Sequence, residues 1–168
     1  LTSLDRLTDR DKCFQLMHRS DDFTVPGPGT VIVSFDMFVN DADGGPIIDP
    51  IGLDHTGPAN QHARVDIMAD GSAPFDTGAG VVSALYIGVD SQATKPNPYT
   101  SYVFDITDAV MPGESYNIRF AETDNQLFLN RGIDNVQIDF TAVPEPGAGA
   151  MIVFGVVIGF VAIRRGRK

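Results

Sequence analysis

The chain contains a ten-residue segment, 30–39, in which apolar side chains recur at every second position. The residues that share one face are Val31, Val33, Phe35, Met37 and Val39. A period of two places alternate side chains on opposite faces of an extended strand, so Ser34 and Asp36 lie on the other face. The pattern therefore predicts a strand with one face in a hydrophobic core.

The same alternation recurs in five further segments, each bounded by turn residues. The residues expected to face inward are Val65 and Ile67; Leu85, Ile87 and Val89; Tyr102, Phe104 and Ile106; Tyr116, Ile118 and Phe120; and Val136, Ile138 and Phe140. Gly, Pro, Asn and Asp separate these segments, and no convincing helical period occurs in 23–141. Short strands divided in this way predict an all-β fold, an antiparallel β-sandwich over residues 23–142.

The C-terminal segment, residues 143–168, is predicted to be a separate unit because three different parts follow one another there. Val-Pro-Glu-Pro at 143–146 forms a short extended strap, since each proline fixes its own φ and restricts the preceding residue. The run 147–163 follows, with 17 residues and no charge. As a helix it would cover roughly 25 Å, slightly less than a hydrocarbon core of about 30 Å.

This run is apolar on every face, so a helix there has no polar side to turn toward water. It ends in a cluster of cations, Arg164, Arg165, Arg167 and Lys168. Such a cluster favours the cytoplasmic side of a membrane. We therefore predict one C-terminal transmembrane helix with its basic end inside the cell. A buried C-terminal helix of a soluble domain is the alternative.

Pro144-Glu145-Pro146, a spacer of small residues, the apolar run and the terminal arginines resemble the PEP-CTERM sorting signal of Gram-negative bacteria. The resemblance covers residues 143–168. It implies export across the inner membrane, retention there by the C-terminal helix, and recognition by an exosortase, a transpeptidase-like membrane enzyme. On this resemblance Pro144, Glu145 and Pro146 are the residues that the exosortase recognises, and the terminal cations stop the helix in the membrane. The processed protein is expected in the cell envelope or outside the cell.

A second resemblance involves Gly132-Ile133-Asp134-Asn135-Val136, which is similar to the closing strands of jelly-roll sandwiches in PEP-CTERM proteins. These sandwiches look like carbohydrate-binding modules. The resemblance implies a jelly roll and an extracellular polysaccharide as a partner. Two roles remain open for Asp134 and Asn135: hydrogen bonds to the neighbouring loop that fix the start of the strand, or contact with a sugar.

Residues 1–22 form a polar N-terminal segment whose apolar residues show no clear period, so a weak helix and an opening strand are both open. No charged n-region followed by an apolar h-region occurs in it, so we expect the export signal to precede Leu1. The only cysteine, Cys13, allows no intrachain disulfide and is interpreted as a small apolar filler.

The formal net charge of the chain is −10. Four of its cations lie in the last five residues, so residues 1–163 carry −14. An acidic body of this kind repels nucleic acid, and no nucleic-acid partner is expected.

The segment 40–60 is rich in Asn, Asp, Gly and Pro. Clustered carboxylates and amide oxygens are the ligands that calcium prefers, so Asn40, Asp41 and Asp43 are candidate calcium ligands. The alternative is a solvated turn in which these side chains bond their own backbone. His55 and His62 lack further ligands at zinc spacing and are interpreted as surface histidines.

No nucleophile elbow surrounds the serines, no Gly-rich phosphate loop occurs, and the absence of Trp disfavours a sugar-cleft hydrolase. We therefore expect a non-enzymatic, exported protein with a structural or adhesive role, with calcium as its one candidate cofactor. A carbohydrate-binding module of a secreted protein is the second hypothesis. A hydrolase that uses the acidic loop is the third.

Overall fold

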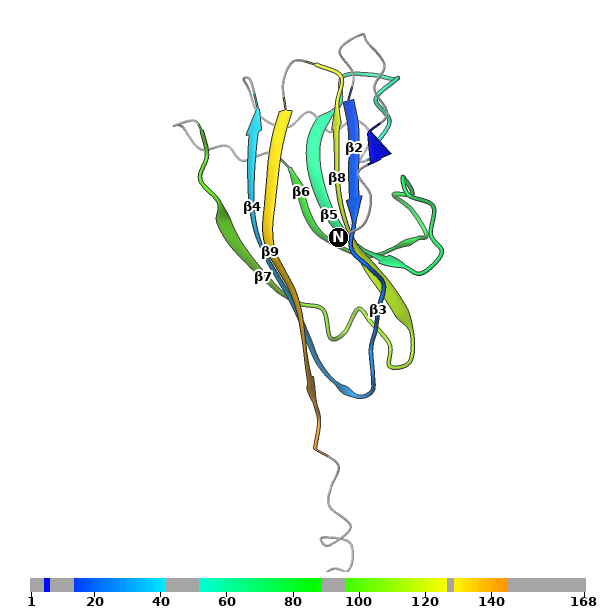
Figure 1. The fold of residues 1–168 in the computed structure, drawn as a ribbon. Helices are drawn as coiled ribbons and strands as arrows, with labels where there is room; N and C mark the ends of the chain where they lie inside the picture. Colours follow the sequence, from blue (N-terminus) through cyan, green and yellow to red (C-terminus); the bar gives the residue numbers. More distant parts are fainter. Residues whose placement is uncertain (1–4, 7–13, 42–51, 89–95, 127–128, 145–168) are drawn as a thin grey trace, which may run out of the picture.

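The computed structural model describes residues 5–6, 14–41, 52–88, 96–126 and 129–144 (Figure 1). Throughout these ranges the regular elements are β-strands, and all strand pairs are antiparallel. The predicted all-β antiparallel fold is therefore confirmed. The predicted transmembrane helix, residues 147–163, lies outside the described residues.

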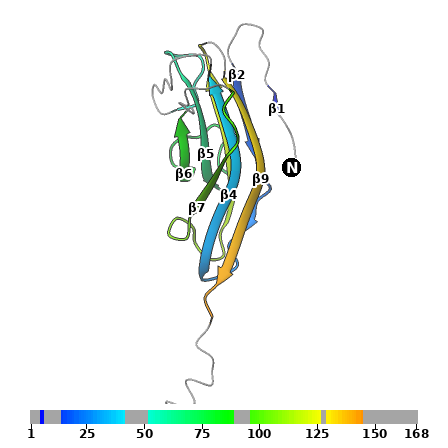
Figure 2. The same ribbon diagram turned by 90° about the vertical axis from the view of Figure 1, so that its left-hand side faces the viewer.

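Two sheets face each other (Figures 1 and 2). The larger has the order β1-β2-β8-β5-β6, with β3 also paired to β8, and the smaller has the order β7-β4-β9. The strands are β1 (Asp5–Arg6), β2 (Phe14–Arg19), β3 (Phe23–Thr24), β4 (Gly29–Asp41), β5 (Gln61–Ala69), β6 (Val81–Gly88), β7 (Thr100–Asp105), β8 (Ser115–Asp124) and β9 (Leu129–Ala142).

The hydrophobic core fills the space between the sheets. The residues of β4 that were predicted to face inward lie at the centre of this core. Val33 is fully buried, and Phe35 is 1% exposed. The Phe35 ring meets Phe120 of the opposite sheet edge to face, with ring centroids 5.2 Å apart. At the other edge Tyr86 of β6 contacts Tyr102 of β7 in the same way, at 5.6 Å. Aromatic contacts therefore join the two sheets at two points.

The residues of β6 that face the core differ from the predicted ones, Leu85, Ile87 and Val89; Val89 lies outside the described residues. Two register shifts in the pairing of β6 with β5 interrupt the simple alternation. As a result Tyr86, together with Leu85, packs against the core, while Ile87 does not join it. A β-bulge adds one residue to one strand and so moves the following side chains to the other face, which the period-two pattern alone cannot reveal.

The larger sheet begins earlier than the predicted domain boundary at residue 23. Strand β2 pairs with β8 along its full length, from Phe14 opposite Asp124 to Arg19 opposite Arg119. Of the two alternatives left open for residues 1–22, a weak helix and an opening strand, the strand is the one found over 14–19. The polar N-terminal segment therefore supplies a strand of the sandwich.

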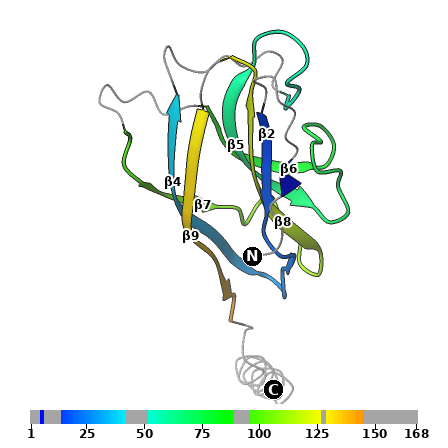
Figure 3. The same cartoon turned by 45° about the horizontal axis from the view of Figure 1, so that its top comes forward.

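Strands β5 and β8 are buried on both faces, unlike β4 and β7. One face supplies the core, and the other carries polar residues such as Arg64, Asp66 and Arg119, which are buried as well. Two loops, 52–60 and 70–80, lie on the outer side of the larger sheet and cover this second face (Figures 1 and 3). The buried polar residues therefore lie beneath these two loops.

Candidate functional site

Three charged side chains form the base beneath the loops, and we call Arg64, Asp66 and Arg119 the Asp66 cluster. Arg64 donates to both carboxylate oxygens of Asp66, with Nε 2.7 Å and Nη2 2.6 Å away. Arg119 donates to the same carboxylate through Nε, at 3.1 Å, and Nη2, at 2.6 Å. Since Asp66 and Arg119 are fully buried, the carboxylate must compensate two guanidinium groups that have lost their hydration.

The Asp66 cluster holds loop 70–80 on the sheet. Nη1 of Arg119 donates to the carbonyl oxygens of Pro74, at 2.9 Å, and Asp76, at 2.5 Å. The Asp76 side chain in turn accepts from the backbone N–H groups of Gly78 and Gly80, and these bonds lower the pKa of its carboxyl. At Gly80 a Cβ atom would lie 2.6 Å from the Asp76 carboxylate, so the loop needs glycine there.

Loop 52–60 is held by two asparagines. Asn60, at the start of β5, donates through Nδ2 to the carbonyl oxygens of Gly52 and Asp54. Asn125, just after β8, accepts from the Asn60 backbone and donates to the carbonyl oxygens of His55 and Pro58. Both loops are therefore fixed by side chains from the central strands or their ends.

An open pocket of about 370 Å³ lies between the two loops, and we call it the loop pocket. Its lining residues are Gly52, Leu53, Asp54, His55, Phe75 and Thr77. Leu53 is buried at 3% exposure, whereas Phe75 presents its ring to solvent at 39% exposure. An aromatic ring next to a carboxylate, an imidazole and a hydroxyl is a lining typical of sites for small polar organic ligands.

His62 lies directly below loop 52–60 and is fully buried, so the prediction of a surface histidine is wrong for it. Because Nδ2 of Asn60 donates to two carbonyl groups, its Oδ1 is the acceptor that faces Nδ1 of His62, at 2.9 Å. Nδ1 therefore carries the proton, and Nε2 is a bare acceptor without a hydrogen-bond partner among the described residues. Burial, followed by the charge of Arg64, lowers the pKa of His62 to about 4.

We expect acid to destabilise the fold through His62. Its pKa is about 4 in the folded chain and 6.5 when unperturbed, so the unfolded chain binds the proton more tightly. The stability that the neutral ring provides is complete above pH 6.5 and is lost as the pH falls toward 4, by about 3 kcal/mol in all. Urea unfolding between pH 7 and pH 4 measures this loss.

Two histidine variants isolate this effect. His62→Gln should flatten the pH dependence in this range, whereas His55→Gln, a change in the half-buried pocket residue, should leave it intact. Burial raises the pKa of Glu122, so its protonation at low pH stabilises the fold, opposite to the protonation of His62. This contribution is the same in every variant. An unchanged pH dependence in His62→Gln would contradict the assignment.

The three predicted calcium ligands, Asn40, Asp41 and Asp43, do not form a loop site in the described part of the chain. Asn40 and Asp41 are the last residues of β4 and are buried, so they do not belong to a solvated turn. The side-chain oxygen of Asn40 accepts from the backbone N–H of Asn97, at 2.7 Å. Asp43 lies outside the described residues. Among those described, no group of three or more His, Cys, Asp or Glu side chains is arranged to hold a metal ion. Calcium binding by this segment stays a prediction.

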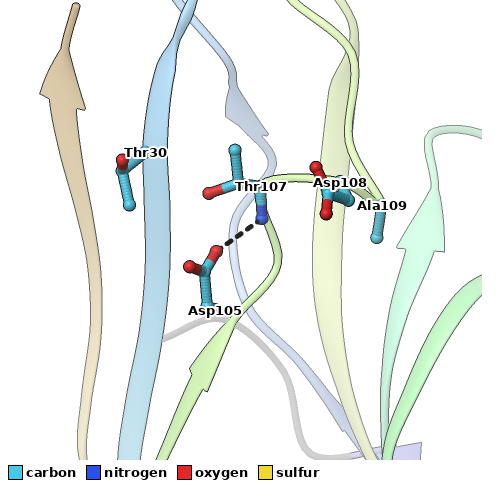
Figure 4. A pocket seen from close by; sticks show the side chains of 5 residues that line it. All are labelled: Thr30, Asp105, Thr107, Asp108 and Ala109. Carbon is cyan, nitrogen blue, oxygen red and sulfur yellow. Dashed lines mark hydrogen bonds between the residues drawn. The ribbon is translucent and has the colours of Figure 1, made fainter.

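A second pocket, of about 580 Å³, opens near the start of β4 (Figure 4). Its lining residues are Thr30, Asp105, Thr107, Asp108 and Ala109. The hydroxyl and backbone N–H of Thr107 lower the pKa of Asp105, and the same hydroxyl accepts from the backbone of Val31. Thr107 therefore serves to fasten the turn after β7 to β4, and the pocket is shallow and acidic.

The Gly-Ile-Asp-Asn-Val segment lies within β9 and not at its start. Asn135 has a positive φ of 52°, at the register shift between β4 and β9. Its Nδ2 donates to Asp36 of β4 at 2.6 Å, and Ser101 of β7 donates to the other oxygen of Asp36 at 2.5 Å. The expected bond to a neighbouring loop is thus a bond to the neighbouring strand. Asn135 fixes the register across the smaller sheet.

Gly132 in the same segment lies under two aromatic rings. A Cβ atom there would fall 2.1 Å from the Phe38 ring and 2.6 Å from the Tyr99 hydroxyl. Phe38 and Tyr99 themselves meet edge to face, at 4.9 Å. The glycine is therefore required for packing on the outer face of the smaller sheet.

Of the predicted sorting residues, Pro144 is described and is exposed just beyond the end of β9. Glu145, Pro146 and the terminal cations Arg164, Arg165, Arg167 and Lys168 lie outside the described residues. Within the ranges that the structure describes, no helix has the length and apolar character to cross a membrane.

Comparison with known proteins gives no match: no family model, no curated protein and no solved structure resembles the chain significantly.

Proposed function

We propose that this chain is an exported β-sandwich protein that is sorted by its C-terminal segment and has a structural or adhesive role at the cell surface. The supporting observation is the position of the sorting motif relative to the fold. The backbone N–H of Val143 donates to the carbonyl oxygen of Pro28, at 3.1 Å, which is the final bond that ties β9 to the sandwich. The Pro-Glu-Pro motif begins at the next residue.

This position suits a substrate of a membrane enzyme. Strand β9 ends at Ala142, at the end of the sandwich away from the two loops (Figure 1). An exosortase in the inner membrane would therefore find its motif, Pro144 to Pro146, directly after the last strand that the structure describes. Residues 147–163 would form the transmembrane helix, and the terminal cations would remain in the cytoplasm. After cleavage the sandwich would be free in the envelope or outside the cell.

The strand order supports a jelly roll for the sandwich. From β3 onward, the chain changes sheet at every connection except the one from β5 to β6. In the resulting order, β2-β8-β5-β6 against β7-β4-β9, consecutive strands lie mostly in opposite sheets, and this alternation supports the proposal of a jelly roll.

Removing residues 144–168 should abolish membrane association and processing while the sandwich still folds, because β9 keeps all its pairings up to Val143. Membrane fractionation of cells that express the full and shortened chains, each with the same export signal, measures the first effect. Mass spectrometry of the mature C-terminus measures the second, with an expected end near Pro144.

A matched variant separates the motif from the helix. Replacing Glu145 and Pro146 with alanine leaves the apolar run and the cations unchanged, so the protein should stay in the membrane with Lys168 intact. Equal fractionation of the full and shortened chains would refute the sorting proposal.

The loop pocket favours a second candidate function, carbohydrate binding by the sandwich. Its exposed Phe75 ring and its polar rim are supported from below by buried hydrogen bonds. In this function the protein would attach to an extracellular polysaccharide. A glycan array tests it, and binding to no glycan would count against it.

A further inference from the structure

We propose that the loop pocket binds a neutral sugar unit of a polysaccharide, with the Phe75 ring as its platform and with Asp54, His55 and Thr77 as the groups that bond its hydroxyls. This inference rests on the proposed carbohydrate-binding function and assigns it a site and a class of sugar.

The Phe75 ring provides an exposed aromatic surface in the loop pocket. Phe75 is 39% exposed although it lines a concave site. Val103 and Met111, which are more exposed at 67% and 64%, line neither of the two pockets described above. The C–H face of a pyranose is apolar and flat, so it can cover an aromatic ring that is otherwise in contact with water. Phe75 is therefore positioned to contact a ligand of this shape.

The polar rim matches hydroxyl groups. Oδ1 of Asp54 accepts from the N–H and the hydroxyl of Thr56, and among the described residues no hydrogen bond uses its Oδ2. The Thr77 hydroxyl and the His55 ring also make no hydrogen bond within the described part of the chain. A sugar hydroxyl both donates and accepts, so a carboxylate, a hydroxyl and an imidazole can each bond to one.

The negative charge of the loop pocket and of the whole body favours a neutral sugar over an anionic one. Among the described residues, no Lys or Arg lines the loop pocket, and Asp54 carries a negative charge at its rim. The body of the protein, residues 1–163, is itself strongly acidic. A uronic acid, a sulfated sugar or a nucleotide would be repelled by both, whereas a hexose would not.

The pocket is also built before any ligand arrives. Asn60 and Asn125 bond the backbone of loop 52–60, and Arg119 bonds the backbone of loop 70–80. Because these loops need no further ordering, a ligand loses little affinity to conformational entropy. The Phe75 and Thr77 side chains are not among the groups described above as holding the loops, so replacing either of them should alter binding and leave the fold unchanged.

The test uses the full chain and two sets of oligosaccharides, neutral ones of glucose, galactose or mannose and anionic ones of uronic acids. We expect binding to at least one neutral oligosaccharide in calorimetry and none to the uronic acids. Phe75→Ala should weaken binding by about tenfold or more, which corresponds to the cost of losing a central aromatic contact. Thr77→Val should weaken it by a smaller factor.

Met111→Ala is the matched control, because it removes an exposed apolar side chain that does not line the loop pocket and should leave both affinity and unfolding unchanged. Equal urea midpoints for the wild type and Phe75→Ala would show that the loss is one of binding. If Phe75→Ala binds as tightly as the wild type, the protein binds sugar elsewhere and the site assignment is wrong. If only the uronic acids bind to the wild type, the assignment to a neutral sugar is wrong and the carbohydrate-binding function stands. If neither set binds, the assignment and the carbohydrate-binding function both fail, while the sorting proposal is unaffected.

Discussion

Replacing Asp66 with alanine should lower the free energy of unfolding by about 4 kcal/mol, because removing one partner of a buried ion pair leaves its counterpart uncompensated. Asp66 is the carboxylate that both Arg64 and Arg119 bond, and all three side chains are at most 3% exposed. Its loss leaves two buried guanidinium groups without their shared anion. Urea unfolding at pH 7 measures the effect.

Two further variants test whether charge is the cause. Asp66→Asn keeps the shape of the side chain and removes its charge, so it should lose most of the same stability. Asp70→Ala, the control, removes an exposed carboxylate four residues away and should change stability by less than about 0.5 kcal/mol. If Asp66→Asn unfolds at the wild-type urea concentration, the charge compensation described here is wrong.

Replacing Phe35 with alanine should cost about 3–5 kcal/mol, the usual range for removing a buried phenylalanine ring. Phe35 is 1% exposed and contacts Tyr102 and Phe104 of the neighbouring strand and Phe120 of the opposite sheet. The cavity would therefore lie between the sheets, where both contribute to its wall. The loss is measured by urea unfolding at neutral pH.

Phe35→Leu, which retains most of the side-chain volume, should cost clearly less than the alanine variant. Val103→Ala on the outer face of the same sheet is the control. Its side chain is 67% exposed, so its removal should be nearly neutral. A loss in Phe35→Ala no larger than that in Val103→Ala would contradict the position of the core.

Phe35→Ala and Asp66→Ala affect opposite faces of the larger sheet: Phe35 packs against its inner face, and Asp66 lies on its outer face. The two variants should therefore have different effects on the candidate site. Phe35 joins the two sheets, whereas the Asp66 cluster joins the outer face to loop 70–80. A weakened Asp66 cluster should therefore disturb the loop pocket as well as the fold. The buried charges thus connect the stability of the sandwich to the geometry of its candidate binding site.

The candidate site was only partly predictable from the sequence. Asp54 and His55 were visible as polar residues in a Pro- and Gly-rich segment, but Phe75 is a single aromatic residue between two turns and shows no periodicity. The backbone-holding role of Asn125 also has no local signal, because its partners His55 and Pro58 lie on a distant segment of the chain. A buried histidine next to a strand arginine, His62 and Arg64, looks in sequence like an exposed polar face.

The sequence by itself determined most of the strands and, except in β6, the faces that point to the core. A period of two is a local property, set by the alternation of side chains along one extended strand, and it placed Val31, Val33 and Phe35 in the core correctly. It also predicts that a segment of different character follows residue 142, because prolines and an uncharged run have local consequences, and β9 does end at Ala142.

Only the tertiary structure decided which polar residues are buried and which loops meet. The outer face of β5 reads as solvent-exposed in sequence, yet the loops on either side of β5 cover it. The carboxylate of Asp66 accepts hydrogen bonds from Arg119, which is 53 positions away in the chain. Burial of a polar group depends on partners brought together by strand pairing, and no local pattern contains them. The loop pocket follows from that pairing, since its two walls meet only when β5 and β8 lie side by side.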